Sequence, residues 1–156
     1  QAAVAPLGTP PGILAIPRKT FYRGQWIRHG GWYPNPVKRL GHRKHSRWSE
    51  PELHESLEGT GVVSVASQPM LHYSFDSILD QAGTNLRYAR IGSHDLFRSG
   101  RRFSLPLLLL KPISKFVECY FFKLGFMDGR LGLIIAVNAA YSMFLKQAFL
   151  LEESGP

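Results

Sequence analysis

Residues 26–40 read WIRHGGWYPNPVKRL, and no other stretch of the chain mixes its residue types so unusually. It holds two Trp, one Tyr, one His, two adjacent Gly and three Lys or Arg. A buried strand tolerates neither a Gly pair nor two prolines well, and a solvated loop does not need two indole rings. The mixture is typical of a site that binds a flat, polar and partly anionic ligand. The Gly pair at 30–31 also predicts a turn between two short strands, at 25–28 and 37–40.

Further strands are predicted on both sides of this stretch, where short β-branched or apolar runs end at Gly or Pro. They cover 13–16, 20–22, 62–66 and 70–75, and Pro17 is expected to end the first. The segment 41–47 is rich in His, Lys and Arg, and is either a solvated basic loop or a loop that faces phosphate. The first half of the chain is therefore predicted to be rich in strands.

The pattern changes to helical periodicity after residue 76. Apolar residues recur at spacings of three and four, which predicts an amphipathic helix from residue 77, a second helix near 95–101 and a third over 113–124. Residues 125–130 form a compact turn, and 131–145 contain no charge. We predict an α/β fold of two parts, short strands at about 13–75 and amphipathic helices at about 77–149, with domain limits at 1–75 and 76–156.

The apolar run at 131–145 raises the question of a membrane span. A span needs about 20 apolar residues, and this run has fifteen, with Asn138, Tyr141 and Ser142 among them. A buried or interfacial helix is the better interpretation. The four leucines at 107–110 and the mixed aromatic and basic residues at 115–123 favour a membrane-surface element, and an ordinary helical core is the competing interpretation.

Charge limits the kinds of partner. The chain has 156 residues and a formal net charge of +8, and residues 18–47 hold nine Lys or Arg and no acid. Such a block suits nucleic acid, an anionic membrane or a phosphorylated small molecule. Cys119 is the single cysteine, so no disulfide can form within the chain.

The strongest chemical signal is the pair His54-Glu55, because a carboxylate beside an imidazole can act as a general base towards a hydroxyl group. An exposed His-Glu pair is, however, more often structural. The aromatic and cationic side chains of 26–39 could stack on sugar rings and meet phosphates, or form an apolar cluster with cations at its rim. The sequence contains no glycine-rich nucleotide-binding motif and no Asp-x-Asp pair.

Four segments, in this order and spacing, resemble one family. They are RHGGWYP at 28–34 with KRL at 38–40, HE at 54–55, PMLHYSF at 69–75 and KLGFMDGRLG at 123–132. Together they are similar to the bacterial inverting glycosyltransferases of family 2, nearest to the enzymes that build the lipopolysaccharide core. The resemblance covers about residues 13–149.

The resemblance implies a GT-A fold, a nucleotide-sugar donor, a glycolipid or lipopolysaccharide-core acceptor, and a divalent metal, Mg or Mn. It makes Glu55 the candidate base. The substrate-binding candidates are Arg28, His29, Trp32, Tyr33 and His54, and the diphosphate-binding candidates are Lys38, Arg39 and Arg43. It further implies a peripheral or membrane-associated enzyme at the cytoplasmic face of the inner membrane, in contact with an anionic membrane surface and not with nucleic acid.

The family's nucleotide-binding half and its Asp-x-Asp motif have no counterpart in these residues. The chain is therefore predicted to be the C-terminal, acceptor-side portion of such an enzyme, to lack the metal ligands, and to be inactive when isolated. The alternative function is a basic module that binds RNA or an anionic membrane without catalysis. A third possibility is a structural domain that mediates assembly only.

Overall fold

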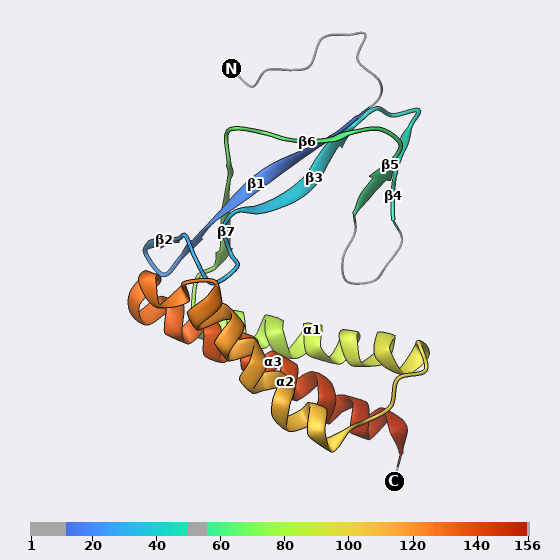
Figure 1. The fold of residues 1–156 in the computed structure, drawn as a ribbon, viewed down its shortest axis with the longest axis vertical. Helices are drawn as coiled ribbons and strands as arrows, with labels where there is room; N and C mark the ends of the chain where they lie inside the picture. The colour runs from blue at the N-terminus through green and yellow to red at the C-terminus, as the bar shows by residue number, and fades with distance from the viewer. Residues whose placement is uncertain (1–11, 50–55, 156) are drawn as a thin grey trace.

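The computed structural model describes residues 12–49 and 56–155. It has a mixed α/β architecture in which the strands come from the first half of the chain and the helices from the second, which confirms the predicted class. Figure 1 shows the strands above a layer of helices, and the two layers meet at the end of the sheet where β2 lies.

The sheet is built around β1 (Ile13–Tyr22), which pairs with four other strands. Two of them run antiparallel to it and two run parallel. The antiparallel partners are β2 (Gln25–Ile27) and β3 (Asn35–Gly41), and the parallel partners are β6 (Val63–Val65) and β7 (Met70–Phe75). A separate antiparallel pair consists of β4 (Ser46–Trp48) and β5 (Leu57–Gly59).

The prediction that Pro17 ends a strand is wrong. β1 continues through this residue to Tyr22 and joins the two strands that were predicted separately. Pro17 lies opposite Pro36 of β3. Proline removes a backbone donor from a ladder, and here the two residues without an N–H face each other, so the interruption is confined to one step.

The second half forms three helices, α1 (Ile78–Arg98), α2 (Leu105–Val117) and α3 (Gly129–Ser154). A π-helical turn (η1, Glu118–Phe122) and a 3-10 turn (η2, Gly125–Asp128) join the last two. The Ser77 hydroxyl caps α1 by accepting a hydrogen bond from the N–H of Asp80 at 3.0 Å, a normal N-cap arrangement.

Two predicted helix limits are wrong. A separate helix at 95–101 does not exist, because α1 runs without a break to Arg98 and ends before Gly100, which has a φ of +83°. The third helix begins at Leu105 rather than at residue 113, and Pro112 lies inside it. The proline costs that helix a backbone hydrogen bond without ending it.

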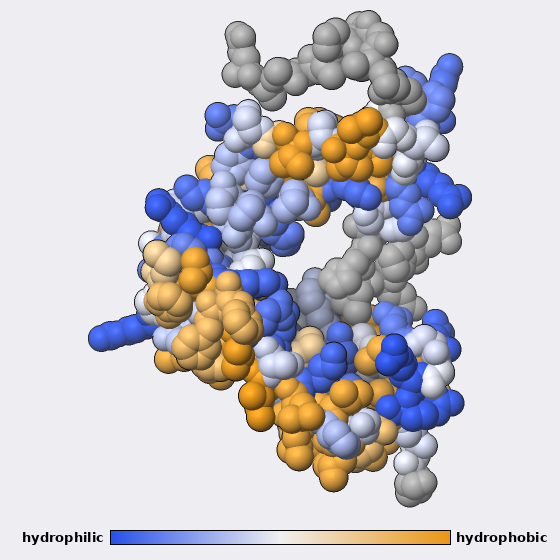
Figure 2. All heavy atoms as spheres, viewed as in Figure 1, coloured by the Kyte–Doolittle hydropathy of each residue, from blue (hydrophilic) through white to orange (hydrophobic). Residues whose placement is uncertain are grey.

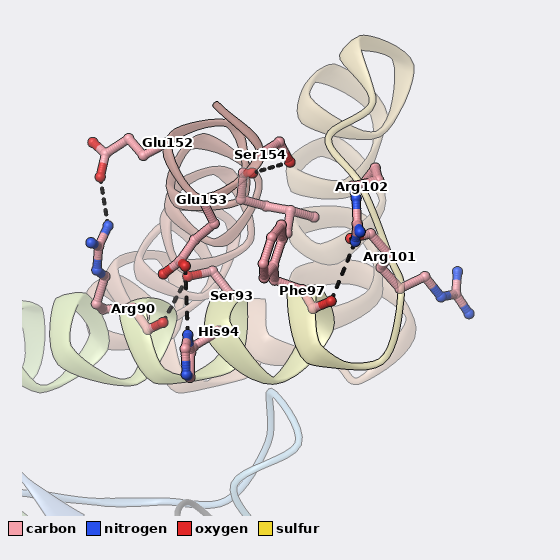
Figure 3. A network of polar contacts seen from close by, with 10 residues as sticks. Arg90, Ser93, His94, Phe97, Arg101, Arg102, Glu152, Glu153 and Ser154 are labelled. Carbon is pink, nitrogen blue, oxygen red and sulfur yellow. Dashed lines mark hydrogen bonds and ion pairs between the residues drawn. The ribbon is translucent and has the colours of Figure 1, made fainter. Parts of the chain in front are cut away.

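The contact between α1 and α3 includes several polar pairs. Gln81 of α1 accepts hydrogen bonds from the Tyr22 hydroxyl at 2.7 Å and from the Asn138 amide at 3.3 Å. At the other end of the helices, Figure 3 shows Arg90 paired with Glu152, and His94 Nδ1 lies 3.5 Å from a Glu153 carboxylate oxygen. Apolar residues are also buried on both helices, among them Ala89 of α1 and Ile135 and Leu150 of α3.

Candidate functional site

The candidate site is centred on the carboxylate of Asp128, which contacts two backbone N–H groups and one histidine ring. One of its oxygens accepts a hydrogen bond from the backbone N–H of His29 at 2.7 Å, and the N–H of Arg28 lies 3.2 Å from the same oxygen. The other oxygen lies 3.1 Å from Nδ1 of the His29 ring. The Asp128 side chain is only 5% exposed. A buried carboxylate that accepts several hydrogen bonds fixes its donors firmly.

The backbone around this site is shaped by glycines. The N–H of Gly30 donates to the carbonyl of Lys123 at 2.8 Å, which ties the turn after β2 to the segment before Asp128. Gly30 and Gly31 have φ values of +67° and +85°, a region that residues with a Cβ enter only at a cost. The Gly pair therefore lets the chain reverse directly over the α2–α3 connection.

The contact to Asp128 defines what the His29 ring can do. With its proton on Nδ1, the ring donates to the carboxylate and leaves Nε2 as a hydrogen-bond acceptor. The side chain is 26% exposed, so a ligand can reach the ring from solvent. An imidazole held in this way can accept a hydrogen bond from a sugar hydroxyl or take up its proton.

Trp32 follows the turn and lies against the core rather than standing free in solvent. Its ring is 5.6 Å from Tyr22 and 6.0 Å from Phe75, and all three border the buried Ile27 and Ile135. Part of the Trp32 surface remains exposed. The residue thus joins three segments, the turn, β7 and α3, beside the Asp128 carboxylate.

A second aromatic group lies along β1. Trp26 is 4.9 Å from Phe21 and 5.8 Å from Tyr73, and the Lys19 ammonium lies 5.2 Å from the Trp26 ring. The cation over the indole fits an attraction between positive charge and the ring face. Trp26 therefore packs in an apolar cluster with a cation near its ring.

The proposed diphosphate-binding side chains lie on β3 and on the turn that follows it. Lys38 is partly buried, and Arg39 and Arg43 are exposed. Within the described residues, no hydrogen bond or ion pair joins these three to His29. Burial lowers the pKa of His72 on β7, and the charges of Arg18 and Arg39 lower it further. This pKa shift indicates that positive charge gathers on one part of the sheet.

The other predicted site residues are Arg28, Tyr33, His54 and Glu55, and the structure describes two of them. The Arg28 side chain is exposed, and Tyr33 is partly buried next to Pro34. His54 and Glu55 lie outside the described residues. Among the residues that are described, no group of three His, Cys, Asp or Glu side chains could hold a metal ion. We therefore assign no residue of this chain to the metal that the resemblance implies.

No family model matches the chain, and no solved structure matches its fold.

Sequence reasoning identified His29 but assigned Asp128 no role. The only local signal was an acid inside a glycine-rich segment, 124–132, in which Arg130 is the one other charged residue. Such an acid must have a polar partner if it is buried. The partner could not be named from the sequence, because it comes from a segment about 100 residues earlier.

An ion-pair cluster beside the site gives a prediction about pH. The Lys123 and Lys115 ammonium groups hydrogen-bond Glu118 and lower its pKa to about 2. The ionised Glu118 and its two lysine partners therefore stabilise the fold when the pH lies above the ordinary pKa of Glu118. This contribution disappears as the pH falls towards 2. Because these side chains are partly exposed, we expect Glu118→Gln to cost about 1 kcal/mol near neutral pH.

Melting temperatures of wild type and Glu118→Gln, measured from pH 7 to pH 2.5, test this prediction. The gap between them should narrow below pH 4.5. Glu58→Gln is the matched control, since the Arg47–Glu58 pair is largely exposed and its atoms lie 3.8 Å apart. A gap of the same size at every pH would contradict the role of the Glu118 cluster.

Proposed function

We propose that this chain is the acceptor-side part of an inverting, nucleotide-sugar-dependent glycosyltransferase that acts on a glycolipid or a lipopolysaccharide core. One observation carries the proposal. Three of the four segments that resemble family 2 meet at one place, although they lie far apart in the sequence. His29 of the first contacts Asp128 of the last, and Trp32 of the first packs against Phe75 of the third.

This convergence supports a binding surface rather than two unrelated stabilising contacts. It brings together a partly exposed imidazole, a partly exposed indole and the exposed Arg28 side chain. Indole faces bind sugar rings, and an oriented imidazole accepts hydrogen bonds from their hydroxyls. Arg28 adds positive charge for a phosphorylated acceptor.

In the proposed reaction, the acceptor hydroxyl attacks the anomeric carbon of the donor sugar and the nucleoside diphosphate leaves. A carboxylate, for which Glu55 is our candidate, takes the proton of the attacking hydroxyl. His29 orients the acceptor through Nε2, and Asp128 holds the His29 ring. Lys38, Arg39 and Arg43 offset the charge of the departing diphosphate. In the complete enzyme, a bound divalent metal would supply further positive charge to that diphosphate.

The test uses the complete enzyme, meaning this chain together with a nucleotide-binding half. We expect it to release nucleoside diphosphate from one member of a panel of UDP-, GDP- and ADP-sugars when a lipopolysaccharide-core acceptor is present. Glu55→Gln should abolish release and leave donor binding intact, because the carboxylate acts on the acceptor proton. The 156-residue chain alone should show no turnover.

Glu58→Gln is the control, since it removes a nearby carboxylate that forms an exposed ion pair. Unchanged turnover by Glu55→Gln would remove Glu55 as the base. Absence of release with every donor, combined with salt-dependent RNA binding by the chain, would favour the basic binding module instead.

A further inference from the structure

α3 is apolar on both sides. Its buried residues are mainly apolar, and they are Gly132, Ile135, Ala136, Leu145, Gln147 and Leu150. On α3, Asn138 bonds to Gln81 of α1, and Gln147 is buried. The opposite side of α3 exposes a stripe of apolar residues at spacings of three, four and seven. Each is 41–52% exposed, and the stripe consists of Leu133, Val137, Tyr141, Phe144 and Leu151. A helix that turns an apolar side outward needs an apolar environment there.

α2 and the turns after it extend the same feature. No residue of α2 is buried, and Leu109, Leu110 and Ile113 are 57–62% exposed. Phe122 is 80% exposed and Met127 59%. Figure 2 shows hydrophobic groups gathered over the α2–α3 layer and over the turns that join the two helices, with a further hydrophobic group over the sheet. We call the exposed apolar residues of α2, η1, η2 and α3 the apolar face.

The charges around the apolar face are mainly positive. Residues 101–130 hold six cations and two acids, a net charge of +4. Both acids are engaged, because Glu118 pairs with Lys115 and Lys123 and Asp128 is buried. Residues 131–151 contain no acid. The surroundings of the apolar face therefore attract anions.

We propose that the apolar face lies on an anionic lipid bilayer, with its leucine and aromatic side chains at the acyl boundary and its lysines and arginines at the headgroups. Apolar residues flanked by Lys and Arg are the pattern of helices that lie in a membrane interface. The sheet and α1 stay on the water side. The inference goes beyond the transfer reaction and does not depend on it.

The structure favours lying on the bilayer over crossing it and over self-association. Residues Gly125–Ser154 are long and apolar enough to span a membrane by length and composition. However, one side of α3 is occupied by the polar contacts to α1, whose Arg90 and His94 pair with Glu152 and Glu153. A second copy docked through the same face would bring two sets of six cations together, which opposes pairing.

The experiment is vesicle flotation of the 156-residue chain. Vesicles of phosphatidylcholine alone are compared with vesicles that also contain phosphatidylglycerol, each at low and high salt. We expect binding to the anionic vesicles that weakens with salt. Leu109→Glu with Ile113→Glu should lower the bound fraction about tenfold, because two charges then face the acyl boundary. Circular dichroism confirms that the variant keeps its helices.

Leu79→Glu is the matched control, since Leu79 is 82% exposed on α1 and lies outside the apolar face. Phe122→Trp gives an independent readout. Brominated lipids should quench more fluorescence in this variant than in the wild type with its three tryptophans, whereas Leu79→Trp should add no quenched component.

Equal binding of wild type and the double variant, or an equal loss with Leu79→Glu, would overturn the proposal. The proposal would also be overturned if the wild type formed a concentration-dependent dimer, the double variant stayed monomeric, and neither bound vesicles. No donor is present in any arm, so a failure of the transferase proposal leaves this result unaffected, and the reverse also holds.

Discussion

Replacing Gly132 by alanine is expected to destabilise the protein by about 3 kcal/mol. Gly132 lies in the first turns of α3 and is buried. A Cβ at this position would overlap the carbonyl oxygen of Gly125 and lie 2.8 Å from its carbonyl carbon. Both obstacles are backbone atoms, so no side-chain rotation can relieve the overlap. The turn that holds Asp128 would have to move.

The measurement is thermal unfolding, where a loss of this size should lower the melting temperature by about 10 °C in a domain of this length. Gly83→Ala is the matched control, because Gly83 lies inside α1 and a Cβ there would meet nothing within 4 Å. It should stabilise by about 0.5–1 kcal/mol, since alanine is the better helix former. Similar melting temperatures for the two variants would refute the close approach of Gly132 to Gly125.

The strand and helix classes could be predicted because they depend on local patterns. The strand predicted at 70–75 is β7, and the one at 37–40 lies within β3. The errors at Pro17 and Pro112 share a cause. The strand was predicted to end at Pro17 and the helix to begin after Pro112, but an element can continue through a proline when the neighbouring residues still pair or pack. That compensation is not visible in a local window.

The candidate site was predictable only in part for a different physical reason. The aromatic and glycine residues of 26–34 predict an unusual turn from composition alone. What that turn rests on is set by contacts about 100 residues away, which no periodicity encodes. The partner of His29, Asp128, therefore emerged only from the fold. The exposed apolar residues of the helical layer were likewise predictable only in part, because an apolar residue in the sequence carries no sign of whether it faces inward.

Replacing Asp128 tests the centre of the candidate site and is expected to affect both the fold and the activity. Asp128→Ala leaves the N–H groups of Arg28 and His29 and the His29 ring without their acceptor. Buried donors without partners cost about 1–3 kcal/mol each, and because these are only partly buried we expect a total of about 3 kcal/mol. Asp128→Asn keeps an acceptor oxygen and should cost about 1 kcal/mol.

His29→Ala separates the fold from the function. Its backbone N–H still donates to Asp128, so only the ring contact is lost and the melting temperature should change little. In the complete enzyme, both His29→Ala and Asp128→Asn should lower kcat about a hundredfold, because a misplaced orienting group costs roughly that much. Asp128 then acts as a positioning residue through the imidazole.

A spectroscopic readout separates this positioning role from a purely structural one. Nitrogen-15 NMR of the His29 ring reports which nitrogen carries the proton. Wild type should show it on Nδ1, where the Asp128 carboxylate accepts it, and Asp128→Asn should change that population while the fold is retained. Because an Asn side chain offers one acceptor oxygen in place of two, the backbone donors and the ring then compete for it. If the Nδ1–H form persists in Asp128→Asn and kcat falls no further than the loss of stability explains, Asp128 only supports the turn. If the ring loses this form and kcat falls with it, the carboxylate orients the imidazole that meets the acceptor.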